Sequence, residues 1–360
     1  MSSRETQTPY DGLPKEAFWR TAMADGASIA DIHRAKFPIS REMKIATAGS
    51  CFAQRLLQHL HARGFNTMEL EPPPPGLTSD EAARYGFGLF SARYGNIYTA
   101  RQLRLLAEET FGLFTPGDPV WERDGRYYDA LRPTIEPDGL RSADAVREQR
   151  RYHLRRVRDL IKTADVFVYT LGLTEVWTHA GTGTAYPTAP GVVCGAYEPA
   201  EYEFKNLTAQ ETYDDLGRFF AIAKKHNPSM KLLLTVSPQR PVATASGKHI
   251  LAAAGYSKAA LRAAAGQLES ERDDVDYFPS YEIVTNPLAA NRYFNPNLRT
   301  VSDEGAALVM DMIVAAYCGD REGVASAGAG EIAAAETATD AASATEDTMC
   351  DEELLEAFAP

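Results

Sequence analysis

Residues 44–54 read Lys44-Ile45-Ala46-Thr47-Ala48-Gly49-Ser50-Cys51-Phe52-Ala53-Gln54, and this stretch decides the fold. Its first five residues form a short apolar run, which predicts a β-strand over 44–48. Apolar side chains then recur at helical spacing until Gly64, which predicts a helix over 52–63. The stretch is therefore a strand–turn–helix unit whose turn carries the hydroxyl of Ser50 beside the thiol of Cys51.

Two roles are open to Ser50 at this turn. The unpaired N–H groups of a helix N-terminus stabilise an alkoxide and the oxyanion formed in acyl transfer, so the hydroxyl could be a nucleophile. Serine is also a preferred N-cap residue, so a hydroxyl that only caps the helix fits the same pattern. On local sequence alone, the cap is favoured.

Three more apolar runs predict strands, and helical patterns separate them. Continuous apolar runs suit strands that are covered on both faces, as in a parallel sheet. Strands alternating with helices predict a doubly wound α/β fold. The predicted strands span 165–171, 231–236 and 275–278, and the predicted helices span about 142–163, 209–226, 257–271 (with Ser257 as N-cap) and 302–317.

Unusual residues follow each strand of this predicted sheet. Ligands of open α/β sheets bind in the crevice outside the carboxyl ends of the strands, so we expect these turns to meet in one pocket. This convergence strengthens the functional interpretation of Ser50. The turns after the second, third and fourth strands are Gly172-Leu173-Thr174-Glu175, Ser237-Pro238-Gln239-Arg240 and Pro279-Ser280-Tyr281-Glu282.

We expect one α/β domain over residues 1–321, interrupted by an insertion. Four prolines at 72–75 break regular structure, and the chain from there to about residue 140 is rich in Gly, Tyr and Pro. A β-hairpin is predicted around Asp124-Gly125. Residues 72–140 are therefore predicted to form an inserted lid region.

The acidic charge of the chain is concentrated at its C-terminal end. All 37 Lys and Arg lie in residues 1–321, whereas ten of the 49 Asp and Glu lie in residues 322–360, so residues 1–321 carry a net charge of −2. This composition predicts a disordered acidic tail over 322–360. Leu354, Leu355 and Phe358 would share one helical face, with which the tail could fold on a protein partner; a solvated tail is the simpler interpretation.

Several classes of protein are disfavoured by what the sequence lacks. It has no apolar stretch long enough to span a membrane, no secretory signal pattern and no Cys spacing typical of metal or redox sites, so we expect a cytoplasmic protein without a metal. The arginines of the predicted helix over 142–163 fit a solvated face better than nucleic-acid binding, because residues 1–321 are almost neutral. Without a dinucleotide-binding or Walker-type glycine loop, no cofactor is expected.

Five motifs, in order and spacing, make the chain resemble the GSCFA domain family. They are Gly49-Ser50-Cys51-Phe52-Ala53, Thr170-Leu171-Gly172-Leu173-Thr174-Glu175-Val176-Trp177, Thr235-Val236-Ser237-Pro238, Tyr256-Ser257-Lys258-Ala259 and Asp276-Tyr277-Phe278-Pro279-Ser280-Tyr281-Glu282-Ile283. The resemblance covers about residues 8–316. It implies kinship with the SGNH, or GDSL-type, esterases and acyltransferases, and hence a flavodoxin-like parallel sheet. Similar proteins often accompany bacterial surface-polysaccharide genes, which implies a small-molecule or glycan substrate.

The resemblance implies roles for several residues of the expected pocket. Ser50 matches the nucleophile, and its own N–H would form part of the oxyanion hole. The turn that begins at Gly172 lies where SGNH enzymes keep a Gly-x-Asn-Asp block, but Thr174 and Glu175 stand in place of its last two residues. Asn96 could replace the missing Asn donor, although a turn residue after Gly95 is an equal reading. The remaining candidates for substrate binding are Arg240 and Glu282.

The largest departure from the family pattern concerns the catalytic base. SGNH enzymes carry an Asp-x-x-His just before the last helix, whereas this chain has Asn297-Leu298-Arg299-Thr300 there. A serine hydroxyl needs an adjacent base to attack at neutral pH. Among the seven histidines, His249 is the best candidate, because its loop leaves the edge of the sheet where the pocket should lie. Glu175 or Glu282 could orient His249 or act as the base itself.

Three functions are consistent with the sequence. The first is an acyl esterase or O-acyltransferase that uses Ser50 as nucleophile and His249 as base on a carbohydrate-related substrate. The second is a catalytically inactive carbohydrate- or ligand-binding protein that kept the pocket and lost the base. The third uses Cys51 as a thiol nucleophile, although its place in the first turn of the helix predicts that it points into the core.

Overall fold

A four-stranded parallel sheet lies at the centre of the computed structural model, which describes residues 8–24, 29–319 and 351–359. The strand order is β1-β4-β8-β9. Each strand lies within one residue of its predicted position: β1 (Ile45–Gly49), β4 (Val166–Leu171), β8 (Lys231–Val236) and β9 (Val275–Phe278). Thr67 forms an isolated parallel bridge with Ile45, on the edge of β1 that faces away from β4.

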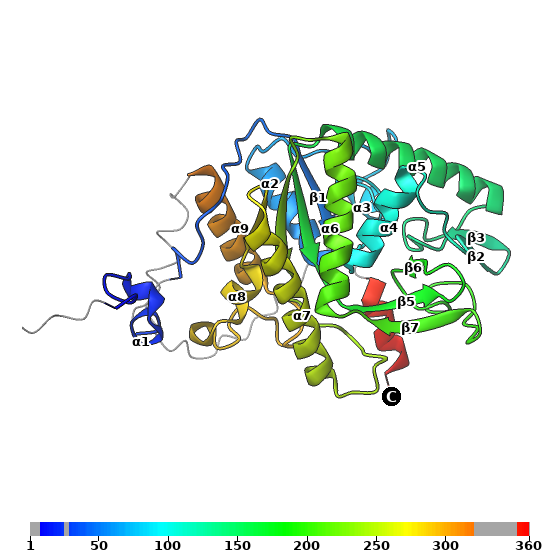
Figure 1. Cartoon of the computed structure of the whole chain (residues 1–360). Coiled ribbons are helices and arrows are strands. Elements are labelled where there is room, and N and C mark those ends of the chain that lie inside the picture. Colours follow the sequence, from blue (N-terminus) through cyan, green and yellow to red (C-terminus); the bar gives the residue numbers. More distant parts are fainter. Residues whose placement is uncertain (1–7, 25–28, 320–350, 360) are drawn as a thin grey trace, which may run out of the picture.

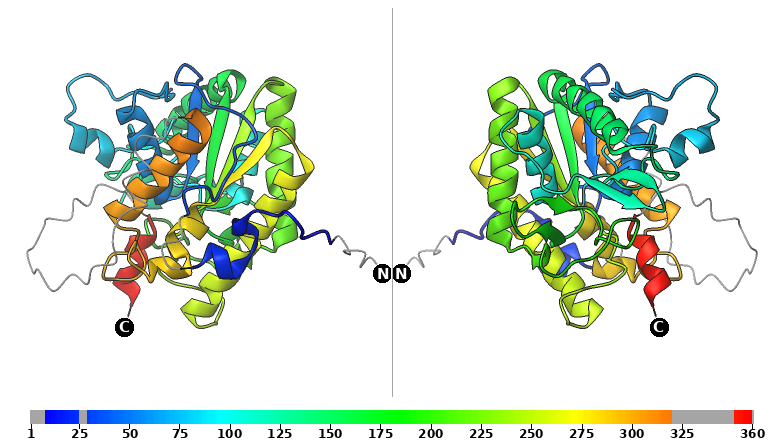
Figure 2. Two further views of the ribbon diagram at one scale, coloured as in Figure 1. Left: turned by 90° about the vertical axis from the view of Figure 1, so that its left-hand side faces the viewer. Right: turned by 90° about the vertical axis from the view of Figure 1, so that its right-hand side faces the viewer.

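Helices cover both faces of this sheet (Figures 1 and 2). One layer consists of α4 (Ala100–Thr110), α5 (Ala143–Thr163), α6 (Ala209–His226) and α7 (Ile250–Glu271), and the other of α2 (Cys51–Ala62), α8 (Ser280–Thr285) and α9 (Asp303–Cys318). Neighbouring strand residues pack into opposite layers: Phe167 joins the core of the first layer, and Val168 joins that of the second. This burial on both faces explains why the strands read as continuous apolar runs.

The start of α7 differs from the prediction. The helix begins at Ile250, seven residues before the expected start, and its N-cap is His249, whose Nδ1 accepts a hydrogen bond from the N–H of Leu251. The alanines that follow residue 250 are strong helix formers and extend the helix toward its N-terminus. Ser257 therefore lies inside the helix, where its hydroxyl accepts a hydrogen bond of 3.1 Å from the N–H of Thr174.

The predicted insertion at 72–140 combines predicted and unpredicted structure. Its hairpin is confirmed: β2 (Val120–Arg123) pairs with β3 (Arg126–Asp129), and Asp124 and Gly125 at the turn have φ angles of 52° and 72°. Helix α3 (Ser79–Arg84) and helix α4 were not predicted. Leu103 of α4 belongs to the main hydrophobic core, so this part of the segment is built into one layer of the domain.

A second small sheet lies beyond the carboxyl end of β4. It has three antiparallel strands in the order β6-β5-β7, which are β5 (Glu175–His179), β6 (Ala185–Tyr186) and β7 (Tyr202–Asn206). The sequence did not predict it. The remaining short elements are η1 (Lys15–Ala17), α1 (Trp19–Ala22), η2 (Pro287–Ala289) and η3 (Asp351–Phe358).

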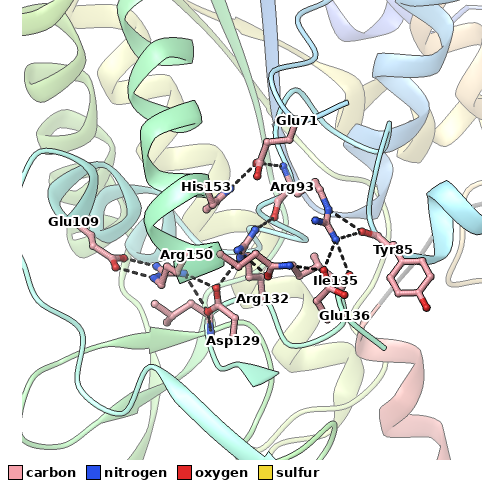
Figure 3. A network of polar contacts seen from close by, with 12 residues as sticks. Glu71, Tyr85, Arg93, Glu109, Asp129, Arg132, Ile135, Glu136, Arg150 and His153 are labelled. Carbon is pink, nitrogen blue, oxygen red and sulfur yellow. Dashed lines mark hydrogen bonds and ion pairs between the residues drawn. The ribbon is translucent and has the colours of Figure 1, made fainter. Parts of the chain in front are cut away.

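Buried ion pairs join the inserted segment to α5 (Figure 3). Asp129 at the end of β3 accepts hydrogen bonds from Arg132 Nε (2.7 Å) and Arg150 Nη1 (3.1 Å). Nearby, His153 Nδ1 lies 2.6 Å from a carboxylate oxygen of Glu71. Arg150 is buried, which differs from the solvated basic face predicted for this helix. Acidic partners from the inserted segment make that burial tolerable.

The C-terminal end of the chain differs in part from the predicted disordered tail. Residues 351–358 form the 3₁₀ helix η3, drawn red in Figure 1 next to the sheet of β5 and β7. Its first residue, Asp351, is only 2% exposed. Residues 322–350 and 360 of the predicted tail lie outside the described residues. Within the described residues, no helix is both long and apolar enough to cross a membrane.

Candidate active site at the carboxyl ends of the parallel strands

The residue before Ser50 has to be glycine. Gly49 has a φ of 144°, and a Cβ atom there would come within 2.5 Å of the carbonyl oxygen of Thr170 on β4. β1 can therefore run close to β4 up to its last residue, and Ser50 follows directly at the N-cap position of α2.

The Ser50 hydroxyl does not cap the helix. No N–H of α2 donates to Ser50 Oγ, and this buried oxygen has no hydrogen-bond partner among the described residues. Serine side chains at N-caps normally accept such a bond, and buried hydroxyls are normally paired. The interpretation of Ser50 as a mere helix cap is therefore wrong, and the hydroxyl is left free to meet a ligand.

Two of the predicted turns meet Ser50 around one small cavity, which we call the Ser50 cavity. It has room for about one water molecule. Gly172 and Arg240, both predicted as site residues, are part of its wall. The full lining is Ser50, Cys51, Tyr98, Gly172, Leu173, Ser237, Gln239, Arg240, Arg299 and Glu352.

Cys51 lines the same cavity, contrary to the prediction that it points into the core. Its thiol donates a hydrogen bond of 3.2 Å to the side-chain oxygen of Gln239, in the turn after β8. The first turn of α2 thus presents both of its reactive side chains to one space.

Lys258 is a site residue that the sequence prediction missed. Its ammonium group is buried and donates a hydrogen bond of 2.8 Å to the carbonyl oxygen of Gly172. Gly172 in turn packs against Ser50, because a Cβ on Gly172 would lie 3.1 Å from Ser50 Cβ. Burial lowers the pKa of Lys258 to about 8, although Glu352 and Cys51 oppose the shift. The sequence signal was a lysine on the buried face of α7, at helical spacing from Ala254 and Leu261.

Two acidic residues of η3 reach the site from the far end of the chain. Asp351 accepts hydrogen bonds from the Thr134 hydroxyl (2.6 Å) and from Asn96 Nδ2 (3.2 Å). Glu352 lines the Ser50 cavity. Burial raises the pKa of Glu352 to about 7, and Lys258 and Arg299 only partly offset that effect.

A larger cavity, which we call the aromatic cavity, adjoins the Ser50 cavity. Tyr98, Leu173 and Glu352 line both. Glu175, a predicted site residue, lies in the wall of the larger one, where its carboxylate accepts hydrogen bonds from Thr244 Oγ1 (2.5 Å) and the N–H of Ala245 (3.2 Å). Its other lining residues are Gln102, Val176, Trp177, Tyr186, Pro187, Thr188, Ala189, Phe204, Pro241, Ala243, Thr244, Ala245, Ala253, Ser257 and Leu355.

Three predicted site residues have other contacts and line neither cavity. Thr174 donates its hydroxyl proton to the side-chain oxygen of Asn206, at 2.6 Å. Glu282 accepts hydrogen bonds from Arg262 and Tyr277. His249 is exposed at the N-terminus of α7. We therefore assign none of the three a role in the chemistry of Ser50.

Asn96 lies next to the site but is engaged on both sides. Its side-chain oxygen accepts a hydrogen bond from Gln54 of α2, and its amide donates to Asp351. Asn96 is thus connected to α2, the helix that Ser50 precedes, and its side-chain amide donates to Asp351 of η3.

The backbone donors expected for an oxyanion also have carbonyl partners. The N–H of Ser50 donates to the carbonyl of Thr170 at 3.3 Å, which is long for such a bond. The N–H groups of Gly172 and Leu173 both donate to the carbonyl of Tyr98, each at 3.0 Å. An oxyanion at this site would have to compete for one of these groups.

Residues 297–300, which stand in place of Asp-x-x-His, form a turn that is stabilised by hydrogen bonds within the segment. The side-chain oxygen of Asn297 accepts hydrogen bonds from the N–H groups of Arg299 (2.9 Å) and Thr300 (3.0 Å). Only Arg299 of this segment lines the Ser50 cavity. Within the described residues, no group of three or more His, Cys, Asp or Glu side chains could hold a metal ion.

Comparison with known proteins places the chain in a family on sequence grounds. No curated protein matches it significantly. The family model described as the GSCFA family matches residues 44–312, which span β1 to α9 and include Ser50, Gly172 and Lys258. The match covers more than half of the 360 residues, and the chain belongs to the GSCFA family.

Proposed function

We propose that this protein is an acyl esterase or O-acyltransferase that uses Ser50 as its nucleophile on a carbohydrate-related substrate. One observation carries the proposal: Ser50 Oγ is buried, has no hydrogen-bond partner among the described residues and faces a cavity at the carboxyl ends of the strands. An unpaired buried hydroxyl costs free energy, so its position calls for a function.

The topology supports an SGNH-like, flavodoxin-like reading of the fold. With the bridge at Thr67 counted as a rudimentary strand beside β1, the order becomes 2-1-3-4-5. Flavodoxin-like sheets have this order and bind ligands at the switch point next to the first strand, where Ser50 lies.

Lys258 is the proton acceptor in this proposal. A neutral lysine amine takes the proton of a serine hydroxyl in known Ser–Lys variants of the catalytic triad. The lowered pKa, about 8, gives Lys258 a substantial neutral fraction near physiological pH. Its hydrogen bond to Gly172, which lines the Ser50 cavity and packs on Ser50, supports this role.

The reaction proceeds in two balanced halves. Ser50 Oγ attacks the ester carbonyl as Lys258 takes its proton, and the tetrahedral intermediate collapses with cleavage of the bond to the alcohol, which receives that proton. Water, in an esterase, or a sugar hydroxyl, in a transferase, then attacks the acyl-Ser50 ester. Lys258 takes the proton of the attacking group, the bond between Ser50 Oγ and the acyl carbon breaks, and Lys258 returns the proton to Ser50 Oγ as the acid or the new ester leaves.

The aromatic cavity supports a sugar-like substrate. It combines the rings of Trp177, Tyr186 and Phe204 with the polar groups of Glu175 and Thr188. Flat apolar rings with a few placed polar groups suit the faces and hydroxyls of a sugar ring.

Two observations each support a different function for the Ser50 cavity. The closed turn at Asn297 and Thr300 supports a ligand-binding protein without catalysis. The presence of Cys51 in the Ser50 cavity supports a thiol nucleophile.

The test uses a fluorophosphonate probe and p-nitrophenyl acetate on the full chain. We expect labelling and hydrolysis to disappear in Ser50→Ala and to persist in Cys51→Ala and His249→Ala. In Lys258→Arg, which cannot lose its proton at neutral pH, the acylation rate should fall by about 10²-fold or more. Loss of labelling in Cys51→Ala alone would replace Ser50 by Cys51. Absence of an adduct from both the wild type and Leu355→Glu, which places a charge in the aromatic cavity, would favour the binding protein.

A further inference from the structure

We propose that residues 351–358, the helix η3, are an intramolecular inhibitor that closes the Ser50 cavity and must leave before an acyl substrate can reach it. The inhibitory consequence rests on the proposed function, but the closure itself does not. We refer to residues 351–358 as the C-terminal segment.

Asp351 anchors the C-terminal segment to the inserted segment. Its two carboxylate oxygens accept one hydrogen bond from Thr134, in the inserted segment, and one from Asn96. Asn96 also binds Gln54, which lies one helical turn after Ser50 on α2. The anchor is therefore tied to the helix that carries Ser50.

Arg299 provides a second contact with the segment. Its guanidinium lies 3.0 Å from a carboxylate oxygen of Glu353, and the Arg299 side chain is only 13% exposed. Because Arg299 also lines the Ser50 cavity, this ion pair brings the segment to the mouth of the site.

Glu352 and Leu355 fill the space that a substrate would need. Glu352 lines both the Ser50 cavity and the aromatic cavity, and Leu355 lines the aromatic cavity. With the segment docked, the space beside Ser50 admits about one water molecule, which is too little for an ester group. Ser50 itself is 4% exposed. An acyl group can contact Ser50 Oγ only after Glu352 has moved.

The segment is suited to leave again. It is a single short 3₁₀ helix, its side chains Leu354 and Phe358 are 44% and 67% exposed, and its docking places two carboxyl groups in poorly solvated positions. Desolvation of acidic groups opposes docking, so the closed state is held by a modest balance of contacts.

The reporter for closure is the thiol of Cys51, because Cys51 lines the cavity that Glu352 closes. Leu355→Glu places a charge in the aromatic cavity and should release the segment, as should Asp351→Ala, which removes the anchor. Leu354→Glu is the matched control, because Leu354 lies on the same helix, is exposed and lines neither cavity. Iodoacetamide labelling is followed by peptide mass spectrometry, which separates Cys51 from the other cysteines.

We expect Cys51 to be alkylated at least tenfold faster in Leu355→Glu and Asp351→Ala than in the wild type, and within twofold of the wild type in Leu354→Glu. A synthetic peptide of residues 351–360 should slow the alkylation of Leu355→Glu again. Equal rates in the wild type and both releasing variants would overturn the proposal.

Fluorophosphonate labelling of Ser50 separates this proposal from the proposed function. If both hold, labelling of Ser50 rises together with alkylation of Cys51. If Cys51 becomes accessible and Ser50 is labelled in no variant, the segment closes the cavity, and the catalytic assignment fails. If the releasing variants lose Ser50 labelling that the wild type shows, the segment serves catalysis and the inhibitory role is wrong.

Discussion

At the scale of single residues, the hydroxyl of Ser50 marks the site because it does nothing for the helix it precedes. Ser50 and Ser302 are both N-cap residues, of α2 and α9, but only Ser302 accepts an N–H hydrogen bond, from Gly305 at 3.2 Å. A serine at the N-cap thus stabilises the helix through its hydroxyl in α9, whereas the hydroxyl of Ser50 makes no such contribution to α2.

This difference predicts that alanine substitution lowers the free energy of unfolding at Ser302 but not at Ser50. Ser302→Ala should lower the free energy of unfolding by about 1 kcal/mol, because it removes an N-cap bond. Ser50→Ala should leave it within about 0.5 kcal/mol of the wild type, or raise it, because no bond is lost and a buried unpaired hydroxyl is removed. Urea unfolding of both variants measures this, and a loss at Ser50 as large as that at Ser302 would restore its role as a cap.

At the scale of elements, α7 and η3 each bring one ionisable group to the neighbourhood of the Ser50 cavity. α7 contributes Lys258 from the interior of the helix, and η3 contributes Glu352 from the last ten residues of the chain. The two groups interact electrostatically, since each shifts the pKa of the other.

Docking of η3 should depend on pH through Glu352. Its pKa is raised from 4.5 to about 7 when docked, so docking is strongest below pH 4.5 and weakens as pH rises toward 7. The charged side chains that face this carboxyl are Lys258 and Arg299, which lower its pKa, and Asp351 and Glu175, which raise it. The ratio of Cys51 alkylation rates, wild type over Leu355→Glu, should rise about tenfold between pH 5.5 and 7.5. Taking the ratio cancels the titration of the thiol itself.

Glu352→Gln is the control for this pH effect. It keeps the size of the side chain and removes its titration, so the ratio of alkylation rates, Glu352→Gln over Leu355→Glu, should rise much less with pH than the wild-type ratio. The residual rise comes from Asp351, whose pKa burial also raises. A wild-type ratio that stays constant or falls with rising pH would show that Glu352 does not govern docking.

At the scale of the whole molecule, the buried ions around Asp129 fix the inserted segment to the helical layer. Burial raises the pKa of Asp129, but Arg150 and Arg132 outweigh that effect and lower it to about 2. The aromatic cavity and the anchor residue Thr134 both depend on this part of the chain, so the network supports the site from a distance.

Removal of Asp129 should therefore destabilise the protein strongly. Asp129→Ala leaves two arginines buried without their shared partner, and we expect a loss of about 3–5 kcal/mol in the free energy of unfolding. The matched control is Asp144→Ala, whose ion pair with Arg147 is exposed and should be worth less than about 1 kcal/mol. In the wild type, the contribution of Asp129 is present above pH 4 and is lost as pH falls toward 2. Similar losses for both variants in urea unfolding would contradict this view.

The sheet was predictable because its signals are local. The four strands are continuous apolar runs, and the turns after β4 and β8 carry residues that do meet at Ser50. The contacts of single side chains were not predictable in this way. In the sequence, Lys258 is one lysine in a predicted helix, and no local pattern predicts that His249 caps α7. Cys51 was assigned to the core because it lies in the first turn of α2, but it lines the Ser50 cavity.

The role of η3 could not be predicted either, because it depends on packing between distant parts of the chain. Residues 351–358 are acidic and short, which is typical of a solvated tail. Their contacts with Thr134, Asn96 and Arg299, and the place of Leu355 in the aromatic cavity, fix their position. Composition records none of these contacts.

The site of covalent modification by a fluorophosphonate in the Leu355→Glu variant decides whether Ser50 is the nucleophile. We predict a single adduct on Ser50 Oγ that is absent from the Leu355→Glu/Ser50→Ala double variant and present in Leu355→Glu/Cys51→Ala. Peptide mass spectrometry locates the adduct. No adduct on Ser50 in the opened protein, or modification of the Ser50→Ala protein at the same rate, would contradict the assignment of Ser50 as the nucleophile.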